Sequence, residues 1–116
     1  MDLLSSFKFV EKKSKFFAQL YELNSLDEVS KVLSTLKKEH PKAAHICSGY
    51  VIEDDALFKN DGEVGHPGKV LLNILQEKNK TSHLLVVIRY FGGIKLGPGG
   101  VSKAFRSAGR GCFQKQ

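Results

Sequence analysis

The strongest constraint on the fold is a run of eight residues, HLLVVIRY (83–90), whose five consecutive side chains at 84–88 are all apolar. A strand of this kind is expected at the centre of a sheet, where neighbouring strands and covering elements exclude water from it. The run enters a segment with five glycines, FGGIKLGPGG, and apolar residues then recur at helical spacing from Val101 to Cys112. The sequence therefore predicts a buried strand, a glycine-rich loop and a helix in succession.

The N-terminal third predicts two strands and one helix. FKFV and FFAQLYEL alternate as paired strands do, and the charged segment EKKSK would connect them as a hairpin. Ser25 and Glu28 have the spacing of a capping box at the start of a helix. The helix should end at Pro41, because proline cannot continue the backbone hydrogen bonding.

The middle of the chain predicts a strand, a long loop and a second helix. Residues 44–52 are rich in β-branched and aromatic side chains, and Gly49 is expected to mark a bulge in this strand. Residues 53–68 contain five acids, three glycines and a proline, so we expect an irregular loop. A helical pattern follows Pro67. About four strands and two to three helices result.

Composition indicates one soluble domain spanning residues 1–116. The chain is 41% hydrophobic and 26% charged, and no apolar run approaches the roughly 20 residues that cross a bilayer. We therefore expect a cytoplasmic protein without a membrane partner. Cys47 and Cys112 form no CxxC pair, and His45 with Cys47 lacks a second pair of metal ligands, so we expect buried thiols, no metal and no cofactor.

Charges are segregated along the chain, whose formal net charge is +6. Five acids and one lysine occupy residues 53–63, whereas no acid follows Glu77 and eight lysines and arginines do. An electropositive surface that attracts phosphate is expected, although a solvated face that aids solubility would have the same composition.

The glycine-rich segment is the main candidate site. Glycines allow close backbone approach, and the free amides at a helix start attract anions. The segment matches neither the Walker pattern nor the dinucleotide fingerprint. Tight packing alone could also require the glycines. The candidate ligand-binding residues, for an anion or nucleic acid, are Arg89, Tyr90, Gly92, Gly93, Lys95, Gly97, Gly99, Gly100, Lys103, Arg106 and Arg110.

Two smaller hypotheses concern aromatic and acidic side chains. Tyr90 or Phe91 could stack on bases, but adjacent residues of a strand face opposite ways, so at most one ring should be free. Asp61, Glu63 and His66 could serve acid-base chemistry, and an acidic surface turn is the simpler interpretation.

Several motifs together resemble the N-terminal domain of the IMPACT/YigZ family. They are KSKFFAQLYELNSLDEV, KKEHPKAAHICSGYVI, DGE, GKVLLNIL and above all VVIRYFGGIKLGPGG, in that order. Departures from the family pattern are Val64 in place of a proline, the shorter stretch Gly65 to Gly68, and Pro98 in place of a small hydroxylic residue. The resemblance covers nearly the whole chain.

This resemblance implies an α+β fold, a two-layer α/β sandwich with two to three helices on one face of the sheet, similar to the second domain of ribosomal protein S five. It also implies a link to translation regulation or nucleic-acid binding. Bacterial members usually continue into a ferredoxin-like domain, which we expect to be absent from this chain.

Two main functions follow as hypotheses, and a third possibility is an interaction module whose partner occupies the basic face. The first is a binding domain for RNA or the ribosome that uses the basic residues around the glycine-rich segment. The second is an enzyme or binder that acts on a phosphorylated small molecule or nucleotide, with Asp61 or Glu63 as the acid-base group. The sequence specifies no oligomeric state.

Overall fold

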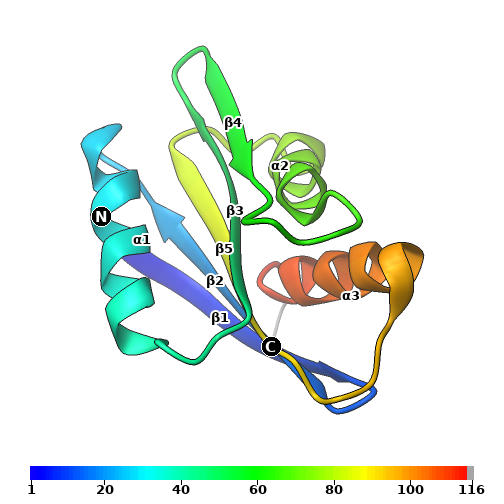
Figure 1. The fold of residues 1–116 in the computed structure, drawn as a ribbon. Coiled ribbons are helices and arrows are strands. Elements are labelled where there is room, and N and C mark those ends of the chain that lie inside the picture. Colours follow the sequence, from blue (N-terminus) through cyan, green and yellow to red (C-terminus); the bar gives the residue numbers. More distant parts are fainter. Residues whose placement is uncertain (115–116) are drawn as a thin grey trace.

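A five-stranded antiparallel sheet forms the centre of the computed structural model, which describes residues 1–114 (Figure 1). The strands lie in the order β1-β2-β5-β3-β4. Their bounds are β1 Asp2–Glu11, β2 Ser14–Glu22, β3 His45–Ile52, β4 Asp55–Lys59 and β5 His83–Tyr90. The apolar run of the sequence is β5, and it is central, with β2 and β3 on either side.

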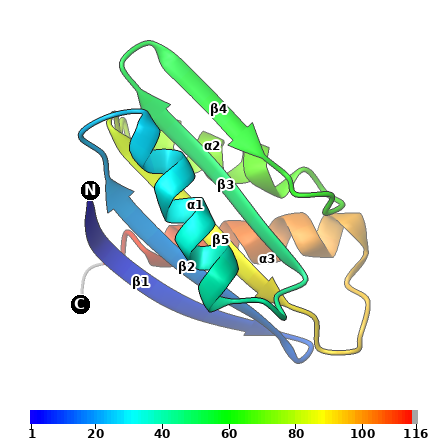
Figure 2. The ribbon, with the colours of Figure 1, turned by 60° about the vertical axis from the view of Figure 1, so that its left-hand side comes forward.

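Helices cover both faces of this sheet (Figure 2). Helix α1, Asp27–Glu39, lies on one face, and α2, Pro67–Glu77, and α3, Gly97–Gly111, lie on the other. The α+β class is confirmed. The expected placement of all helices on one face and the expected count of about four strands differ from the structure. The similarity to ribosomal protein S five stays a prediction.

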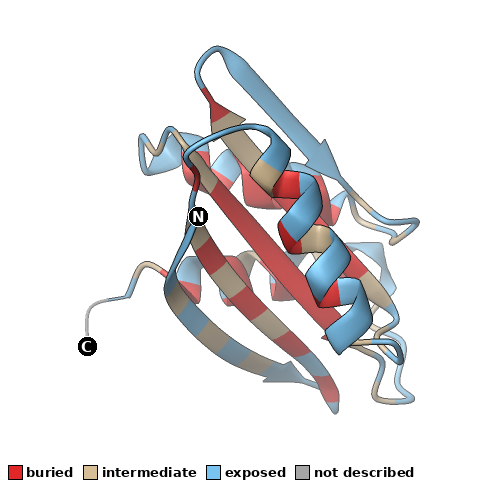
Figure 3. Cartoon of the chain, turned by 90° about the vertical axis from the view of Figure 1, so that its left-hand side faces the viewer, coloured by how far each residue is buried: buried red, intermediate tan, exposed pale blue. Residues whose placement is uncertain are grey.

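The two-sided cover explains why residues 84–88 of β5 are all apolar. Leu85 and Val87 face the cluster under α2 and α3, whereas Leu84, Val86 and Ile88 face the cluster under α1. Figure 3 shows β5 as a continuous buried strand, beside a strand β2 whose residues alternate in burial. Burying each such side chain stabilises the fold by roughly 1.5–3 kcal/mol.

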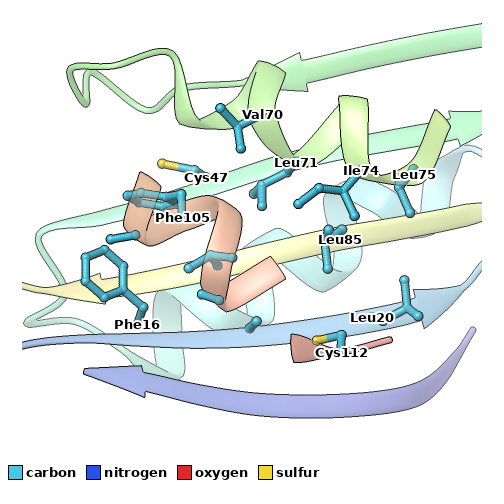
Figure 4. Packing of buried hydrophobic residues seen from close by; sticks show 14 of the residues in the cluster. Phe16, Leu20, Cys47, Val70, Leu71, Ile74, Leu75, Leu85, Phe105 and Cys112 are labelled. Atoms are coloured by element: carbon cyan, nitrogen blue, oxygen red, sulfur yellow. The ribbon is translucent and has the colours of Figure 1, made fainter. Parts of the chain in front are cut away.

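The larger cluster joins the sheet to α2 and α3 (Figure 4). The rings of Phe16 on β2 and Phe105 on α3 meet edge to face, with centroids 5.2 Å apart. Leu71 and Leu75 of α2 are fully buried beside them. This packing fixes α3 against the sheet. It therefore determines where the glycine-rich segment, which leads from β5 into α3, must end.

Strand β4 is absent from the sequence-based expectation, which placed an irregular loop over 53–68. Its sequence, DALFK, does not alternate between apolar and polar residues, and all five residues are exposed, so no pattern of burial indicated a strand. The strand forms because the chain turns back at Glu53, with φ 52°, and pairs with β3 as a hairpin.

The start of α1 forms only half of the expected capping box. The carboxylate of Glu28 accepts a hydrogen bond of 2.7 Å from the backbone N–H of Asn24. The hydroxyl of Ser25, however, donates to the carboxylate of Asp27 rather than capping a backbone amide, and the helix begins at Asp27. The end of the helix at Glu39, before Pro41, agrees with the prediction.

Gly49 is required for close packing and does not form a bulge. It pairs in register with Phe58 on β4 and with Leu85 on β5. A Cβ atom at this position would lie 2.5 Å from the backbone nitrogen of Leu72 on α2. Glycine therefore lets α2 approach the sheet backbone.

Among the described residues, no helix is both long and apolar enough to span a bilayer.

We predict that Gly49→Ala lowers the free energy of unfolding by on the order of 1–3 kcal/mol, because α2 must shift to admit the methyl group. Urea denaturation would measure this loss. Gly99→Ala is the control: apart from its chain neighbours and the backbone of its own helix, no described atom lies within 4 Å of the added Cβ, and alanine favours a helix, so stability should stay unchanged or rise. Equal losses in both variants would contradict the packing explanation.

Candidate functional site

Arg89 is a buried structural cation at the end of β5. Its side chain is 6% exposed, and Nη1 donates a 2.7 Å hydrogen bond to Oε2 of Glu63, whose side chain is 5% exposed. Nη2 donates to the hydroxyl of buried Ser14 at 3.3 Å, and the guanidinium lies 5.4 Å from the ring centroid of Phe16. Arg89 therefore joins β5 to β2 and to the segment before α2, and it is closed to an outside phosphate.

The segment between β4 and α2 is held to the sheet by its own polar groups. Asp61 Oδ2 accepts a 2.7 Å hydrogen bond from the N–H of Ile46, and the Asp61 carbonyl pairs with Nδ1 of His45 at 2.8 Å. His45 Nε2 lies 3.6 Å from Glu63 Oε2. Glu63 is thus placed between Arg89 and His45.

The three predicted acidic-loop residues do not form one site. Asp61 and Glu63 both turn toward the sheet and are engaged there. His66 is exposed at the residue before α2, with φ 51°, and forms no hydrogen bond to either carboxylate among the described residues. Within residues 1–114, no group of three or more His, Cys, Asp or Glu side chains is arranged to hold a metal ion.

Both cysteines are buried free thiols, as the sequence predicted. Burial raises the pKa of the Cys47 thiol strongly, and the carboxylates of Asp61 and Glu63 raise it further, against an opposing effect from Arg89. Burial also raises the pKa of Cys112 to about 11. Neither thiol is therefore a nucleophile at neutral pH, because the thiolate is the reactive form.

The glycine-rich segment has a structural part and an open part. The N–H of Gly92 donates to Ser14 Oγ at 3.2 Å, and a Cβ atom there would lie 2.1 Å from the carbonyl carbon of Lys13. Gly92 therefore holds the segment against the β1–β2 turn. Gly93 and Gly97 have φ values of 90° and 72°, and open space surrounds both of them. These two glycines supply turns that an L side chain rarely adopts.

The open part includes the first turn of α3. The helix begins at Gly97, four residues before its apolar stripe, so Gly97, Gly99 and Gly100 belong to the helix rather than to the preceding loop. Leu96 provides no side-chain cap, and the first turn contains no acid. Amides at such a helix start attract anions, although Pro98 contributes no N–H. Lys95, next to this turn, is exposed.

The basic ridge of α3 is divided along its length. Lys103 lines a hollow of about 260 Å³ between α3 and the β1–β2 hairpin, together with Lys12 and Gly100. Arg106 is half-buried one turn farther along. Arg110 lies at the far end of the helix, about 20 Å from Gly97 at 1.5 Å per residue, and pairs with Glu77 at 3.2 Å. Lys103 is therefore near the open glycines and Arg110 is not.

Further lysines share the end of the molecule that holds the open glycines. The β1–β2 turn, the connection from α1 to β3 and the glycine-rich segment all meet there (Figures 1 and 2). The sequence did not bring these residues together, because they are far apart in the chain. These further lysines are Lys12, Lys13 and Lys15 of the first hairpin, Lys37 and Lys38 in the last turn of α1, and Lys42 after it.

Comparison with known proteins identifies the family of this chain. The model of the Impact N-terminal domain matches residues 12–113. The chain belongs to the Impact N-terminal domain family. It is 40% identical over 100 residues to the IMPACT family member YvyE of Bacillus subtilis (strain 168), which covers 83% of this chain and 46% of that protein. YigZ of Escherichia coli (strain K12) is 36% identical over 100 residues, and the match covers 81% of this chain and 49% of YigZ. Protein IMPACT of Rattus norvegicus is 35% identical over 96 residues, and the match covers 76% of this chain and 30% of that protein.

Solved structures share the fold of this Impact domain. A crystal structure of a hypothetical protein has a TM-score of 0.85 at 30% identity, covering 96% of this chain and 58% of that one. The structure of the two-domain translational regulator Yih1 has a TM-score of 0.62 at 25% identity, covering 95% and 45%. The chain spans about half the length of the bacterial relatives that it matches.

The structure unites two motifs on which the resemblance to this family rested. DGE supplies Glu63 and RYFGG supplies Arg89, and the ion pair between them is the contact that joins the two segments. Sequence reasoning treated these residues as separate candidate sites. Only the number of acids and bases, which does not specify partners, was available to suggest a pairing.

We predict that Glu63→Gln lowers the free energy of unfolding by roughly 3 kcal/mol, because the buried charge of Arg89 loses its partner. Glu77→Gln is a matched control, since its pair with Arg110 is about half exposed and such pairs contribute about 0–1 kcal/mol. Urea unfolding of both variants measures the difference. Similar small losses would show that the Arg89 pair is not a structural tie.

We predict that neither thiol reacts with a chromogenic disulfide reagent in the folded protein at pH 8, although free cysteines ionise with a pKa of about 8.5. Raised pKa values and burial keep Cys47 and Cys112 protonated and covered. Both should react promptly in denaturant. Stoichiometric reaction of the folded protein would contradict the buried placement.

Proposed function

We propose that this Impact domain binds RNA, alone or on the ribosome, and acts in translation regulation. The binding surface would be the basic end, defined as the β1–β2 turn, the α1–β3 connection, the glycine-rich segment and the first turn of α3. The observation that carries the proposal is the convergence of exposed lysines from these segments around open glycine amides.

Charge at the basic end favours a polyanion. Eight exposed lysines lie in or next to these segments: Lys12, Lys13, Lys15, Lys37, Lys38, Lys42, Lys95 and Lys103. Among the described residues, the acids near them that form no ion pair are Glu11 and Glu39, whereas the carboxylates of Asp61 and Glu63 bond within the protein. The acids of the β3–β4 turn, Glu53 to Asp55, lie at the opposite end of the sheet (Figure 1). A molecule polarised in this way would present its positive end to a phosphate backbone.

The link to translation rests on a relative. Yih1, whose structure shares this fold over 95% of the chain, is described as a translational regulator. Regulation of translation by this chain is an extension from that protein. Binding to RNA would give the domain a physical means of acting on the translation machinery.

The geometry favours binding over acid-base catalysis. An enzyme acting on a phosphorylated small molecule was expected to use Asp61 or Glu63. Asp61 is exposed, but its carboxylate accepts a hydrogen bond from the N–H of Ile46, and the buried carboxylate of Glu63 pairs with Arg89, so both carboxylates already have partners within the fold. The lysines of the basic end are exposed and, among the described residues, form no ion pair or hydrogen bond within the fold, so they are available to a ligand.

We predict that RNA affinity falls steeply as salt rises, because phosphate contacts release counterions. The variant carrying both Lys95→Ala and Lys103→Ala should bind single-stranded and duplex RNA more weakly and reduce the slope of log K against log salt by roughly 0.7 per lysine. Fluorescence anisotropy across a salt series would measure both.

The control for this experiment removes the same charge elsewhere. Lys31 on α1 is exposed beside Asp27, and Lys78 follows α2 at the other end of the sheet. The variant carrying both Lys31→Ala and Lys78→Ala should keep nearly all of the affinity. Equal losses in the two double variants, or no RNA binding by the parent chain, would refute the proposal.

A further inference from the structure

A groove lined by aromatic rings and lysines opens at the basic end. Its volume is about 410 Å³, within the range of 300–1,000 Å³ that is usual for small-ligand sites. It lies where the start of β2, the end of β5 and the end of α1 meet. Its lining residues are Lys13, Lys15, Phe17, His40, Tyr90 and Phe91.

The rings inside this aromatic groove support one another. The ring of Phe17 meets that of Tyr90 edge to face, with centroids 5.8 Å apart, and lies stacked near the imidazole of His40 at 6.5 Å. The Tyr90 hydroxyl shares a 2.6 Å hydrogen bond with Nδ1 of His40. These contacts hold the three rings in place, and the hydroxyl of Tyr90 already has a hydrogen-bond partner.

Phe91 is the exposed member of the set. It is 53% exposed, more than Phe58 on β4 at 43%, and it belongs to neither of the two core clusters. The buried guanidinium of Arg89 lies 5.7 Å from its centroid and supports it by a cation–π contact. Phe91 thus presents a supported ring at the rim of the groove.

Charge around the rings has one sign. Lys13 and Lys15 line the groove and are exposed, and no carboxylate is among the lining residues. Aromatic platforms flanked by lysines are the arrangement that holds single-stranded nucleic acid, because bases stack on the rings while cations follow the phosphates. Duplex bases are already stacked on their neighbours and cannot enter such a groove.

We propose that the aromatic groove holds an unstacked base of single-stranded RNA against Phe91, with Lys13 and Lys15 contacting the flanking phosphates. This inference rests on the proposed RNA-binding function and adds a preference to it. A purely electrostatic surface should favour duplex RNA, whose charge density is higher. The groove should instead favour the single strand.

The test is a set of anisotropy titrations with the full chain at one salt concentration. The probes are a labelled oligouridine of about 12 nucleotides, within the span that single-strand-binding domains cover, and the duplex of the same strand with its complement. The parent chain should bind the single strand more tightly. Phe91→Leu should weaken that binding by about 5- to 100-fold, the loss expected for one stacked base, and should change duplex binding little.

Two further variants separate stacking from burial of apolar surface. Phe91→Trp keeps an aromatic face and should retain the affinity for the single strand. Phe58→Leu alters another partly exposed phenylalanine, on β4 and away from the basic end, and should have no effect. Thermal unfolding of each variant verifies that it folds. The variant carrying both Lys13→Ala and Lys15→Ala should also bind the single strand more weakly, because it lacks the two lysines that would contact the flanking phosphates.

The outcomes are distinguishable. If the parent chain binds neither RNA, the proposed function and the groove both fail. If it binds the duplex as tightly as the single strand, or if a folded Phe91→Leu variant keeps full affinity, the groove is overturned while the RNA-binding function stands. Weaker binding by Phe58→Leu equal to that of Phe91→Leu would also overturn it.

Discussion

The buried ion pair between Arg89 and Glu63 is the contact on which the arrangement of the candidate site depends. Arg89 ends the central strand, and its two terminal nitrogens bond Glu63 from the segment before α2 and Ser14 from the start of β2. Ser14 in turn accepts the N–H of Gly92. Through these few bonds the first hairpin, the central strand and the glycine-rich segment keep fixed positions. The open glycines and lysines are therefore displayed by a rigid base.

The residues of one motif have two different roles, one structural and one on the exposed surface. In RYFGGIKLGPGG, Arg89 is buried and Gly92 packs against the backbone of Lys13, so both serve the fold, whereas Phe91, Gly93 and Lys95 are exposed. A short signature can thus combine a structural anchor with a ligand-binding surface. Because Arg89 is buried, the exposed positive charge of the site comes from lysines. Lysine side chains are flexible and strongly hydrated, and they suit contacts with a phosphate backbone.

Elements with an apolar period were predictable and those without one were not. The run at β5, the alternation in β2 and the stripe of α3 each report burial directly, so their positions agree with the sequence. Strand β4 has no buried residue, and only its pairing with β3 defines it. In the same way, Arg89 and Lys95 were recognised as candidates, but the enclosure of Arg89 depends on Glu63, 26 residues away, and no local pattern encodes that contact. Lys13, Lys15 and His40 were missed because the groove unites three separate parts of the chain.

The place of β5 in the strand order has a consequence for how the chain acquires this structure. Val86, at its centre, pairs with Gln19 on one side and Ser48 on the other, so both neighbours precede it in the chain. The two N-terminal hairpins can form locally, but they share no sheet until β5 lies between them. Pairings across long loops slow folding, because closing the loop costs entropy before contacts compensate for it. During synthesis the apolar faces of β2 and β3 therefore stay uncovered until residues 83–90 have been made, and β5 completes the sheet just before the glycine-rich segment completes the basic end.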